Sequence, residues 1–321
     1  MSSDLERVVP VSTELAQLAE QAQSYARAAR SPRTVKAYAS DWRHFSNWCA
    51  ERGLERLPAT PITVAMYVTD MAANGLRPAT IDRRLVAINR EHKVARAPQP
   101  GLSPEVKETL AGVRRSVGTA QRQVAALLTD DLKSMLSATP DSLRGLRNRA
   151  VLLLGFAGAF RRTELVSLNR GDLDFQRNGL VVTLRRSKTD QEGRTRRVGI
   201  PFGSTELTCP VRGVQRWLEA AEISRGAVFR AVDRHDNVSS ERLSDRSIAR
   251  LVKEHAELVG LDPSRYAGHS LRAGLATSAA DGGASDRAIM RQTGHRSTAM
   301  VNRYVREGRL FRDNAAVLAG L

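Results

Sequence analysis

Apolar residues in the first third of the chain recur at helical spacing between clear start and stop signals. The stretches 31–53, 60–75 and 103–118 each begin with serine or threonine followed by proline, and each ends at glycine. Serine and threonine cap a helix, proline suits its first position and glycine ends it. Between the last two lies 77–96, an amphipathic stretch with a basic outer face. The pattern predicts a compact all-helical domain over 31–118.

The rest of the chain mixes helical and strand-type periodicity. Residues 180–186 and 195–201 are rich in β-branched and apolar residues, and the polar stretch 187–194 between them predicts a hairpin. Helices are expected around this hairpin, at 129–157, 161–168, 210–222 and 244–259, and they predominate to the end. The predicted parts are an N-terminal extension (1–30), the helical domain (31–118), a linker (119–126) and a second domain of helices and strands (127–321).

Charge gives the first indication of a partner. The 321 residues include 50 basic and 34 acidic side chains, a formal net charge of +16, and both predicted domains are basic. Such an excess favours a polyanion such as nucleic acid. The chain shows neither a membrane-spanning run of about 20 apolar residues nor the apolar core of a secretory signal, so we expect a cytoplasmic protein. Cys49 and Cys209 are too far apart in sequence to indicate a disulfide framework or a zinc site, and we expect no metal and no cofactor.

Four short segments of the second domain carry side chains that together could cut a phosphodiester. They are FRRTEL (160–165), SKTDQEGR (187–194), HSLR (269–272) and GHRSTAMVNRY (294–304). A tyrosine phenol can attack phosphorus, but its pKa of about 10 means that it needs help from positive charge. Arginine stays protonated, and its planar fork can grip two non-bridging oxygens. The leaving 5′ oxygen needs a proton, which a lysine of lowered pKa can supply.

Lysine usage points to one such proton donor. Only six of the 50 basic residues are lysines, and Lys188 is the sole lysine between Lys133 and Lys253. A chain so biased towards arginine would keep a lysine where a proton must move. Drift in composition explains the same count.

The order of these residues resembles the active site of a known family. The tyrosine recombinase (phage integrase) family has the same arrangement as Arg161, Lys188, His269, Arg272, His295 and Tyr304. The resemblance covers about residues 30–320, and WRHFSNWC and GLRPATIDRRLVAINREHK in the first domain are similar in layout to Cre-like or Xer-like members. It implies a mainly α fold with a small antiparallel β-sheet. An all-helical core-binding (SAM-like) domain and a mixed α+β catalytic domain would form a C-shaped DNA clamp.

The resemblance also implies a role for each residue. These roles are phosphate binding by Arg161 and Arg272, bracing of the site by Glu164, acid catalysis by Lys188, base catalysis or proton sharing by His269, a hydrogen bond to the phosphate from His295, and nucleophilic attack by Tyr304. The attack would give a 3′-phosphotyrosyl link that keeps the energy of the broken bond. Rejoining would then need neither ATP nor metal.

Two alternatives stay open at the level of single residues. The segment GAFRRTEL departs from the family's small-residue lead into the first arginine, and Arg162 competes with Arg161 for the phosphate. The spacing to Glu164 favours Arg161. Tyr266, which precedes HSLR, is the rival nucleophile, although its position is more typical of a packed side chain.

The resemblance implies that the helix beginning near residue 34 and the helix 77–96 approach the major groove. The candidate DNA contacts, most of them to phosphates, are Lys36, Arg43, Arg77, Arg83, Arg84, Arg246 and Arg250. The partly apolar tail 310–321 would dock in a neighbouring subunit and link a homotetramer on two inverted-repeat DNA sites. A monomer could instead fold this tail back on itself.

The sequence therefore predicts a site-specific recombinase that acts on double-stranded DNA at the nucleoid, in integration, excision or resolution. Two other functions are compatible with the same residues. A type IB-like topoisomerase shares the chemistry, and a noncatalytic sequence-specific DNA-binding protein shares the clamp.

Overall fold

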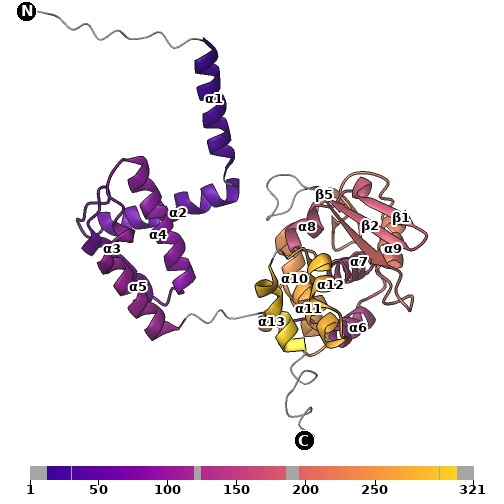
Figure 1. Cartoon of the computed structure of the whole chain (residues 1–321). Helices are drawn as coiled ribbons and strands as arrows, with labels where there is room; N and C mark the ends of the chain where they lie inside the picture. Colours follow the sequence, from indigo (N-terminus) through magenta and orange to yellow (C-terminus); the bar gives the residue numbers. More distant parts are fainter. Residues whose placement is uncertain (1–12, 30, 119–123, 186–194, 296, 309–321) are drawn as a thin grey trace, which may run out of the picture. The chain divides into compact units, whose positions relative to one another are not determined.

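The computed structural model describes residues 13–29, 31–118, 124–185, 195–295 and 297–308 (Figure 1). Contacts divide the chain into two compact units, Met1–Gln121 and Arg122–Leu321. Each unit has a hydrophobic core of its own. Residues 119–123 of the predicted linker lie outside the described residues.

The described part of the first unit is helical. Its elements are α1 (Thr13–Ala28), α2 (Pro32–Ala50), α3 (Pro61–Ala73), α4 (Pro78–Val94), the 3-10 helix η1 (Pro100–Leu102) and α5 (Pro104–Val117). The predicted caps are confirmed, because the side chains of Ser31, Thr60 and Ser103 each accept a hydrogen bond from the backbone N–H three residues later. Helix α1 falls within the predicted extension, where no helix is expected from the sequence.

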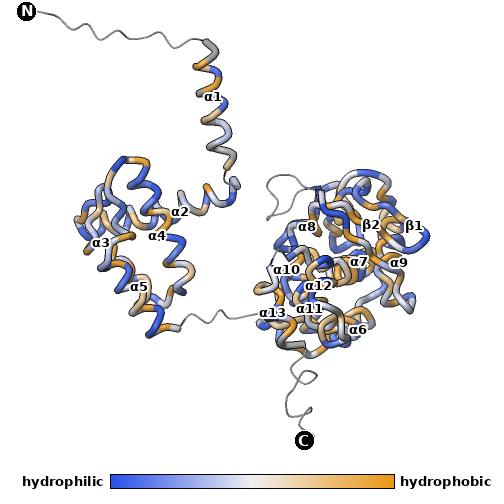
Figure 2. Tube along the Cα trace, in the orientation of Figure 1, coloured by the Kyte–Doolittle hydropathy of each residue, from blue (hydrophilic) through white to orange (hydrophobic). Residues whose placement is uncertain are grey.

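Aromatic rings form the centre of the first core. Phe45 and Trp48 of α2 lie against Tyr67 of α3, with ring centroids 5.0 and 5.1 Å from the tyrosine ring. Ile81 and Ile88 of α4 are fully buried in the same cluster. Apolar and hydrophilic positions alternate along these helices (Figure 2), which is how each helix buries one face.

The second unit combines helices with two small antiparallel sheets. Its helices are α6 (Thr129–Ala138), α7 (Leu143–Ala157), α8 (Arg162–Ser167), α9 (Pro210–Ala220), α10 (Asp245–Leu258), α11 (Ser270–Asp281), α12 (Asp286–Thr293) and α13 (Thr298–Gly308), with short 3-10 turns η2 (Arg170–Asp172) and η3 (Pro263–Arg265). The first sheet has the order β1 (Leu173–Gln176), β2 (Gly179–Leu184), β3 (Arg196–Pro201), and the second pairs β4 (Arg230–Val232) with β5 (Val238–Arg242). The predicted fold class, mainly α with a small antiparallel sheet, is confirmed.

Two details differ from the sequence-based expectation. The run 129–157 is divided, because α6 ends before Pro140 and Ser142 caps α7 through the N–H of Gly145. Strands β1, β4 and β5 are not predicted at all. They are three to five residues long, and their pairing partners in the fold stabilise them more than their own composition does.

Helix α7 is the buried centre of the second unit. Its residues Ala150–Leu154 are at most 4% exposed. It packs against α9 and α11, and apolar residues mark its path in Figure 2. The turn that follows α7 carries the first candidate catalytic residue, so the core sets the position of the site. In the described part of the chain, no helix is both long enough and apolar enough to cross a bilayer.

Candidate active site

Arg161 lies in the turn between α7 and α8 and is held by a buried carboxylate. Its Nη1 donates to Oε1 of Glu164 at 2.6 Å, and its backbone N–H donates to Oε2 at 2.9 Å. Glu164 is only 3% exposed. The neighbouring Arg162 instead has its Nε 3.2 Å from Oδ2 of Asp245. The geometry therefore favours Arg161 over Arg162 as the arginine that faces the site.

A glycine makes room for the aromatic residue that precedes Arg161. Phe160 is 1% exposed and its ring lies over Gly158, where a Cβ atom would come within 2.2 Å of the ring. Phe160 replaces the small residue that the family has before its first arginine, and the missing side chain of Gly158 makes room for the ring.

Arg272 is buried and ties two segments of the site together. It is the third residue of α11 and is 1% exposed. Its Nη1 donates to the carbonyl of Ala159 at 2.8 Å and to that of Thr293 at 2.5 Å. Its Nη2 is buried without a hydrogen-bond partner among the described residues. Burial, followed by the charge of Arg161, lowers the pKa of Arg272 to about 10.

His269 and Tyr304 are in direct contact. The Nε2 atom of His269, at the N-cap of α11, lies 2.8 Å from the phenolic oxygen of Tyr304 on α13. Helix α13 is positioned because Val301 and Val305 pack with Ala276 of α11 in a small core cluster. When Nε2 carries no proton, it accepts the phenolic hydrogen and can take it during attack.

The protein packed around His269, together with nearby positive charges, keeps its imidazole neutral. Part of its side chain is open to solvent, yet the protein packed around the ring is the main cause that lowers its pKa. The positive charges of Arg272, Arg161 and Arg303 lower the pKa further. A neutral imidazole is the form that can accept the proton of a phenol.

His295 follows α12 and stacks on the nucleophile candidate. Its ring centroid is 6.0 Å from that of Tyr304, with the planes 21° apart. Its Nδ1 lies 2.8 Å from Oγ1 of Thr293. Burial, followed by the charges of Arg272 and Arg161, lowers the pKa of His295 to about 4. The hydroxyl of Thr293 donates to the carbonyl of Ile289 at 2.7 Å, so it accepts from the N–H at Nδ1 of His295. Nε2 is then the atom that takes up a second proton, and it can donate this proton to an anion whose charge favours the protonated ring.

This shift gives the DNA-free protein a defined pH dependence. The unfolded chain binds a proton at His295 near pH 6.5, whereas the folded chain binds it only near pH 4. The unfolded state therefore holds more protons in this window, and the free energy of unfolding rises with pH through it. We expect the stability from this residue to be complete above about pH 6.5 and to disappear as the pH falls towards 4.

Chemical denaturation at a series of pH values measures this effect. The His295→Gln variant should lose less stability than the wild-type protein between those two pH values, because it lacks the titrating group. Parallel pH profiles of the two proteins would contradict the assignment.

Arg196 is a residue that the sequence analysis does not single out. It begins β3, and its Nη2 lies 3.9 Å from Oε2 of Glu164. A signal was present in the sequence, since β3 alternates and places Arg196, Val198 and Ile200 on the same face. An arginine among inward-facing apolar positions of a strand needs an anionic or carbonyl partner.

Two guanidinium groups, those of Arg161 and Arg196, thus lie against the carboxylate of Glu164, and the charge of a third, Arg272, interacts with it. The excess positive charge suits a phosphodiester, and arginine provides paired donors for its non-bridging oxygens. Tyr266, the rival nucleophile, is 7% exposed and belongs to the core of the second unit. Lys188 and its hairpin 187–194 lie outside the described residues. The described residues include no group of three or more His, Cys, Asp or Glu side chains that could hold a metal ion.

The candidate DNA contacts fall in both units and differ in their surroundings. Lys36, Arg43 and Arg77 are exposed and form no ion pair within the described part of the chain. Arg83 and Arg84, in contrast, are held by Asp41. Arg83 donates to both carboxylate oxygens at 2.8 and 2.9 Å, and Nε of Arg84 lies 3.7 Å from Oδ1. In the second unit Arg246 is exposed, and Nε of Arg250 lies 3.6 Å from Oε1 of Glu254.

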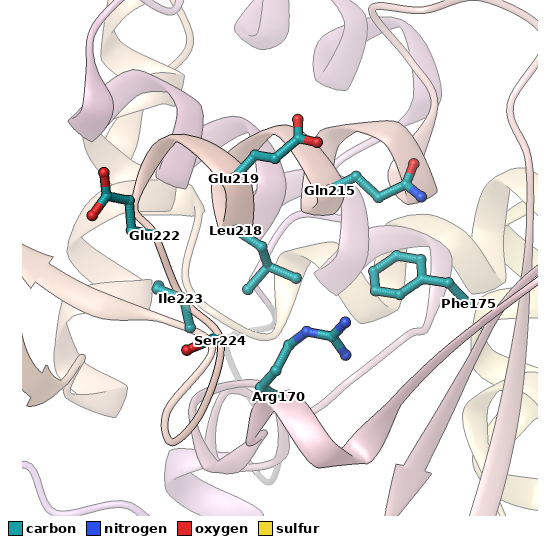
Figure 3. Close-up of a pocket in the computed structure, with 8 residues that line it drawn as sticks. All are labelled: Arg170, Phe175, Gln215, Leu218, Glu219, Glu222, Ile223 and Ser224. Carbon is teal, nitrogen blue, oxygen red and sulfur yellow. The ribbon is translucent and has the colours of Figure 1, made fainter.

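A surface hollow elsewhere in the second unit shares no residue with this site. It has a volume of about 630 Å³ and is lined by residues of α9, η2 and β1 together with the segment after α9 (Figure 3). Glu219 and Glu222 lie on its rim, and their carboxylates would repel a polyanion. Arg170 is already engaged there, since its Nη1 donates to the carbonyl of Leu173. This hollow is therefore poorly suited to a phosphodiester.

Comparison with known proteins gives the following relationships. The model of the phage integrase family matches residues 125–309, and that of the phage integrase N-terminal SAM-like domain matches residues 24–98. A protein of Selenomonas ruminantium named integrase/recombinase xerD homolog is 40% identical over 290 residues, or 89% of this chain and 85% of that protein. Recombinase cre of Escherichia phage P1 is 24% identical over 87% of this chain and 85% of its own length.

The fold is also found among solved structures. A lambda integrase (75-356) dimer bound to a COC′ core site matches with a TM-score of 0.60 at 16% identity, covering 93% of this chain and 97% of that one. At this level of identity the match concerns the fold.

Proposed function

The chain belongs to the phage integrase family of tyrosine recombinases, and from this premise we propose that it cuts and rejoins DNA strands at specific sites through Tyr304. The observation that carries the proposal is the 2.8 Å contact between Nε2 of His269 and the phenolic oxygen of Tyr304. This pair lies beside the cluster of Arg161 and Arg272, whose charges lower the pKa of His269. A nucleophile, a base and an anion site are thus close together.

The reaction divides into an attack and a departure. The phenolic oxygen of Tyr304 bonds to phosphorus while its proton passes to His269, and the bond from phosphorus to the 5′ oxygen breaks. Arg161 and Arg272 neutralise the charge that develops on the non-bridging oxygens, and Glu164 orients Arg161. The product is a 3′-phosphotyrosyl link, and attack by a 5′ hydroxyl reverses the step without ATP.

Two further residues complete the proposed chemistry. His295 donates a hydrogen bond to the phosphate through Nε2, because the negative charge of the phosphate favours the protonated ring. Lys188 supplies the proton to the leaving 5′ oxygen, as a lysine among arginines is suited to do.

The partner is double-stranded DNA, bound by both the core-binding domain (31–118) and the catalytic domain (127–321). The net charge of +16 supports this partner. We propose that four subunits assemble on two inverted-repeat sites and that the tail 310–321, which lies outside the described residues, links them. Action on such sites would take place in the cytoplasm, at the nucleoid.

A suicide substrate tests the function. A nicked duplex built on the inverted repeats next to the gene should trap a covalent protein–DNA adduct that survives a denaturing gel. Relaxation of any supercoiled plasmid by dilute protein would instead indicate a topoisomerase. Specific binding without an adduct would indicate a noncatalytic DNA-binding protein.

The exposed, unpaired basic residues of α2 give a binding prediction. Replacing Arg43 with alanine should weaken DNA binding to a similar extent for all sequences and lower the slope of log affinity against log salt by about one. Fluorescence anisotropy at several salt concentrations measures both. Arg114 serves as a control because its Nη2 lies 2.8 Å from Oδ1 of Asp82, and Arg114→Ala should leave the slope unchanged. An unchanged slope in Arg43→Ala would remove this residue from the interface.

A further inference from the structure

Arg196 occupies a position in the arginine cluster that differs from those of Arg161 and Arg272. Its Nη1 donates to the carbonyl of Gln292, at the end of α12, over 3.3 Å. Its Nη2 is buried, has no hydrogen-bond partner among the described residues and lies 3.9 Å from Oε2 of Glu164. The guanidinium thus lies between the end of α12 and the carboxylate that holds Arg161.

The turn after α12 is shaped around this guanidinium. Gly294 ends α12 in the left-handed region with φ 69°, and a Cβ atom there would come within 2.2 Å of Nη1 and 2.8 Å of Cζ of Arg196. A side chain at position 294 would therefore be both strained and in collision. The backbone at Gly294 therefore approaches the guanidinium of Arg196 closely.

Glu164 needs a second cationic partner when DNA is bound. In the DNA-free protein Arg161 uses both of its oxygens, one through Nη1 and one through the backbone N–H. A phosphate draws the guanidinium of Arg161 towards itself. The carboxylate is 3% exposed, so it cannot replace this partner with bulk water.

We propose that Arg196 is a positioning residue that acts on the phosphate through Glu164 and Arg161. It is held by the end of α12 and lies near Oε2 of Glu164, whereas the guanidinium of Arg161 contacts Oε1. It holds the carboxylate of Glu164 in place while Arg161 turns to the phosphate. This role rests on the proposed strand-cleavage function and adds a residue to that site.

The neighbouring residue provides a matched control. Arg197 is the next residue of β3, but it is exposed on the opposite face of the strand. Arg196→Gln should lower the single-turnover cleavage rate on the suicide substrate by roughly 10- to 100-fold, as small displacements of catalytic groups do. The DNA affinity should change by less than about threefold, since the buried guanidinium makes no docking contact. Arg197→Gln should cleave at the wild-type rate.

A double-mutant cycle tests the route of the effect. If Arg196 acts through Glu164, the double variant Glu164→Gln/Arg196→Gln should cleave at most about threefold more slowly than Glu164→Gln alone. The reason is that Glu164→Gln already removes the charged partner of Arg196. Rate losses that multiply would overturn the proposal. The cleavage rate of Arg196→Lys should lie between those of the wild type and Arg196→Gln, because an ammonium keeps the positive charge but not the planar fork of the guanidinium. Arg196→Lys also serves as the test variant if Arg196→Gln melts at a lower temperature.

A neutral phosphate analogue separates positioning from direct contact. In a methylphosphonate substrate a methyl group replaces one charged non-bridging oxygen, so the loss of an arginine that neutralises this oxygen matters less. Arg161→Ala should recover part of its rate on this substrate, whereas Arg196→Gln should not. Recovery of Arg196→Gln would make Arg196 a phosphate ligand and would refute the positioning role. Adduct formation by the wild-type protein shows separately whether the proposed function holds.

Discussion

Replacing Tyr304 with phenylalanine is expected to abolish the covalent protein–DNA adduct while leaving DNA binding intact. Removal of a nucleophile costs at least about 10⁴-fold in rate, because the remaining groups stabilise charge but form no bond. The phenyl ring keeps the shape of the side chain on α13. The 2.8 Å contact with His269 is lost, and one such hydrogen bond contributes about 1 kcal/mol to stability. The fold and the binding surfaces should therefore persist.

Denaturing gel electrophoresis of the suicide-substrate reaction measures the adduct, and anisotropy measures binding. Tyr266→Phe is the matched control, because Tyr266 is buried in the core of the second unit. It should form the adduct normally. An adduct in Tyr304→Phe, or its loss in Tyr266→Phe alone, would move the nucleophile to another side chain.

Replacing Arg272 with lysine is expected to lower the single-turnover cleavage rate by about 10²- to 10³-fold, the usual effect of losing one preorganised donor to a developing oxyanion. The three N–H groups of a lysine are on one nitrogen, so a lysine cannot bond the carbonyls of Ala159 and Thr293 through one nitrogen and present a second nitrogen to the phosphate, as the guanidinium fork can. Arg272→Ala should lose at least as much activity. It should also lose stability, about 1–3 kcal/mol for each buried carbonyl left unpaired.

Comparison of the two Arg272 variants separates chemistry from folding. Thermal melting reports the stability, and the single-turnover rate at saturating protein reports the chemistry. Arg177→Ala, at an exposed position between β1 and β2, should change neither quantity. Cleavage by Arg272→Lys at the wild-type rate would remove this arginine from the reaction.

In the first unit, helices α2, α3, α4 and α5 could be predicted from the sequence to within about three residues, whereas α1 was not expected. Ser31, Thr60 and Ser103 each bond to a backbone N–H three residues away, so cap and helix lie in one short stretch of chain. The break between α6 and α7 was missed, although Pro140 and Ser142 mark it, because apolar residues continue on both sides. The short strands β1, β4 and β5 were missed because three to five residues are too few to show a clear alternation.

Membership in the phage integrase family and the mainly α fold could be predicted, since the motifs keep their order along the chain. The sequence could also name Tyr304 and Arg272 as candidates. It could not show that Arg272 is buried with carbonyls of two other segments as partners, nor that Asp41 holds Arg83. Arg196 was overlooked for the same reason, because its neighbours Glu164 and Gln292 are far from it in sequence.

By itself, the sequence determined where helices α2, α3 and α5 start and which side chains can react. It also determined the net positive charge that suits DNA. These features depend on hydrogen bonds over a few residues or on summed charge. The tertiary structure alone decided which guanidinium groups are buried, which carboxylate serves them and which imidazole touches the phenol. Those outcomes depend on segments up to about a hundred residues apart, and burial then sets the strength and protonation of each group.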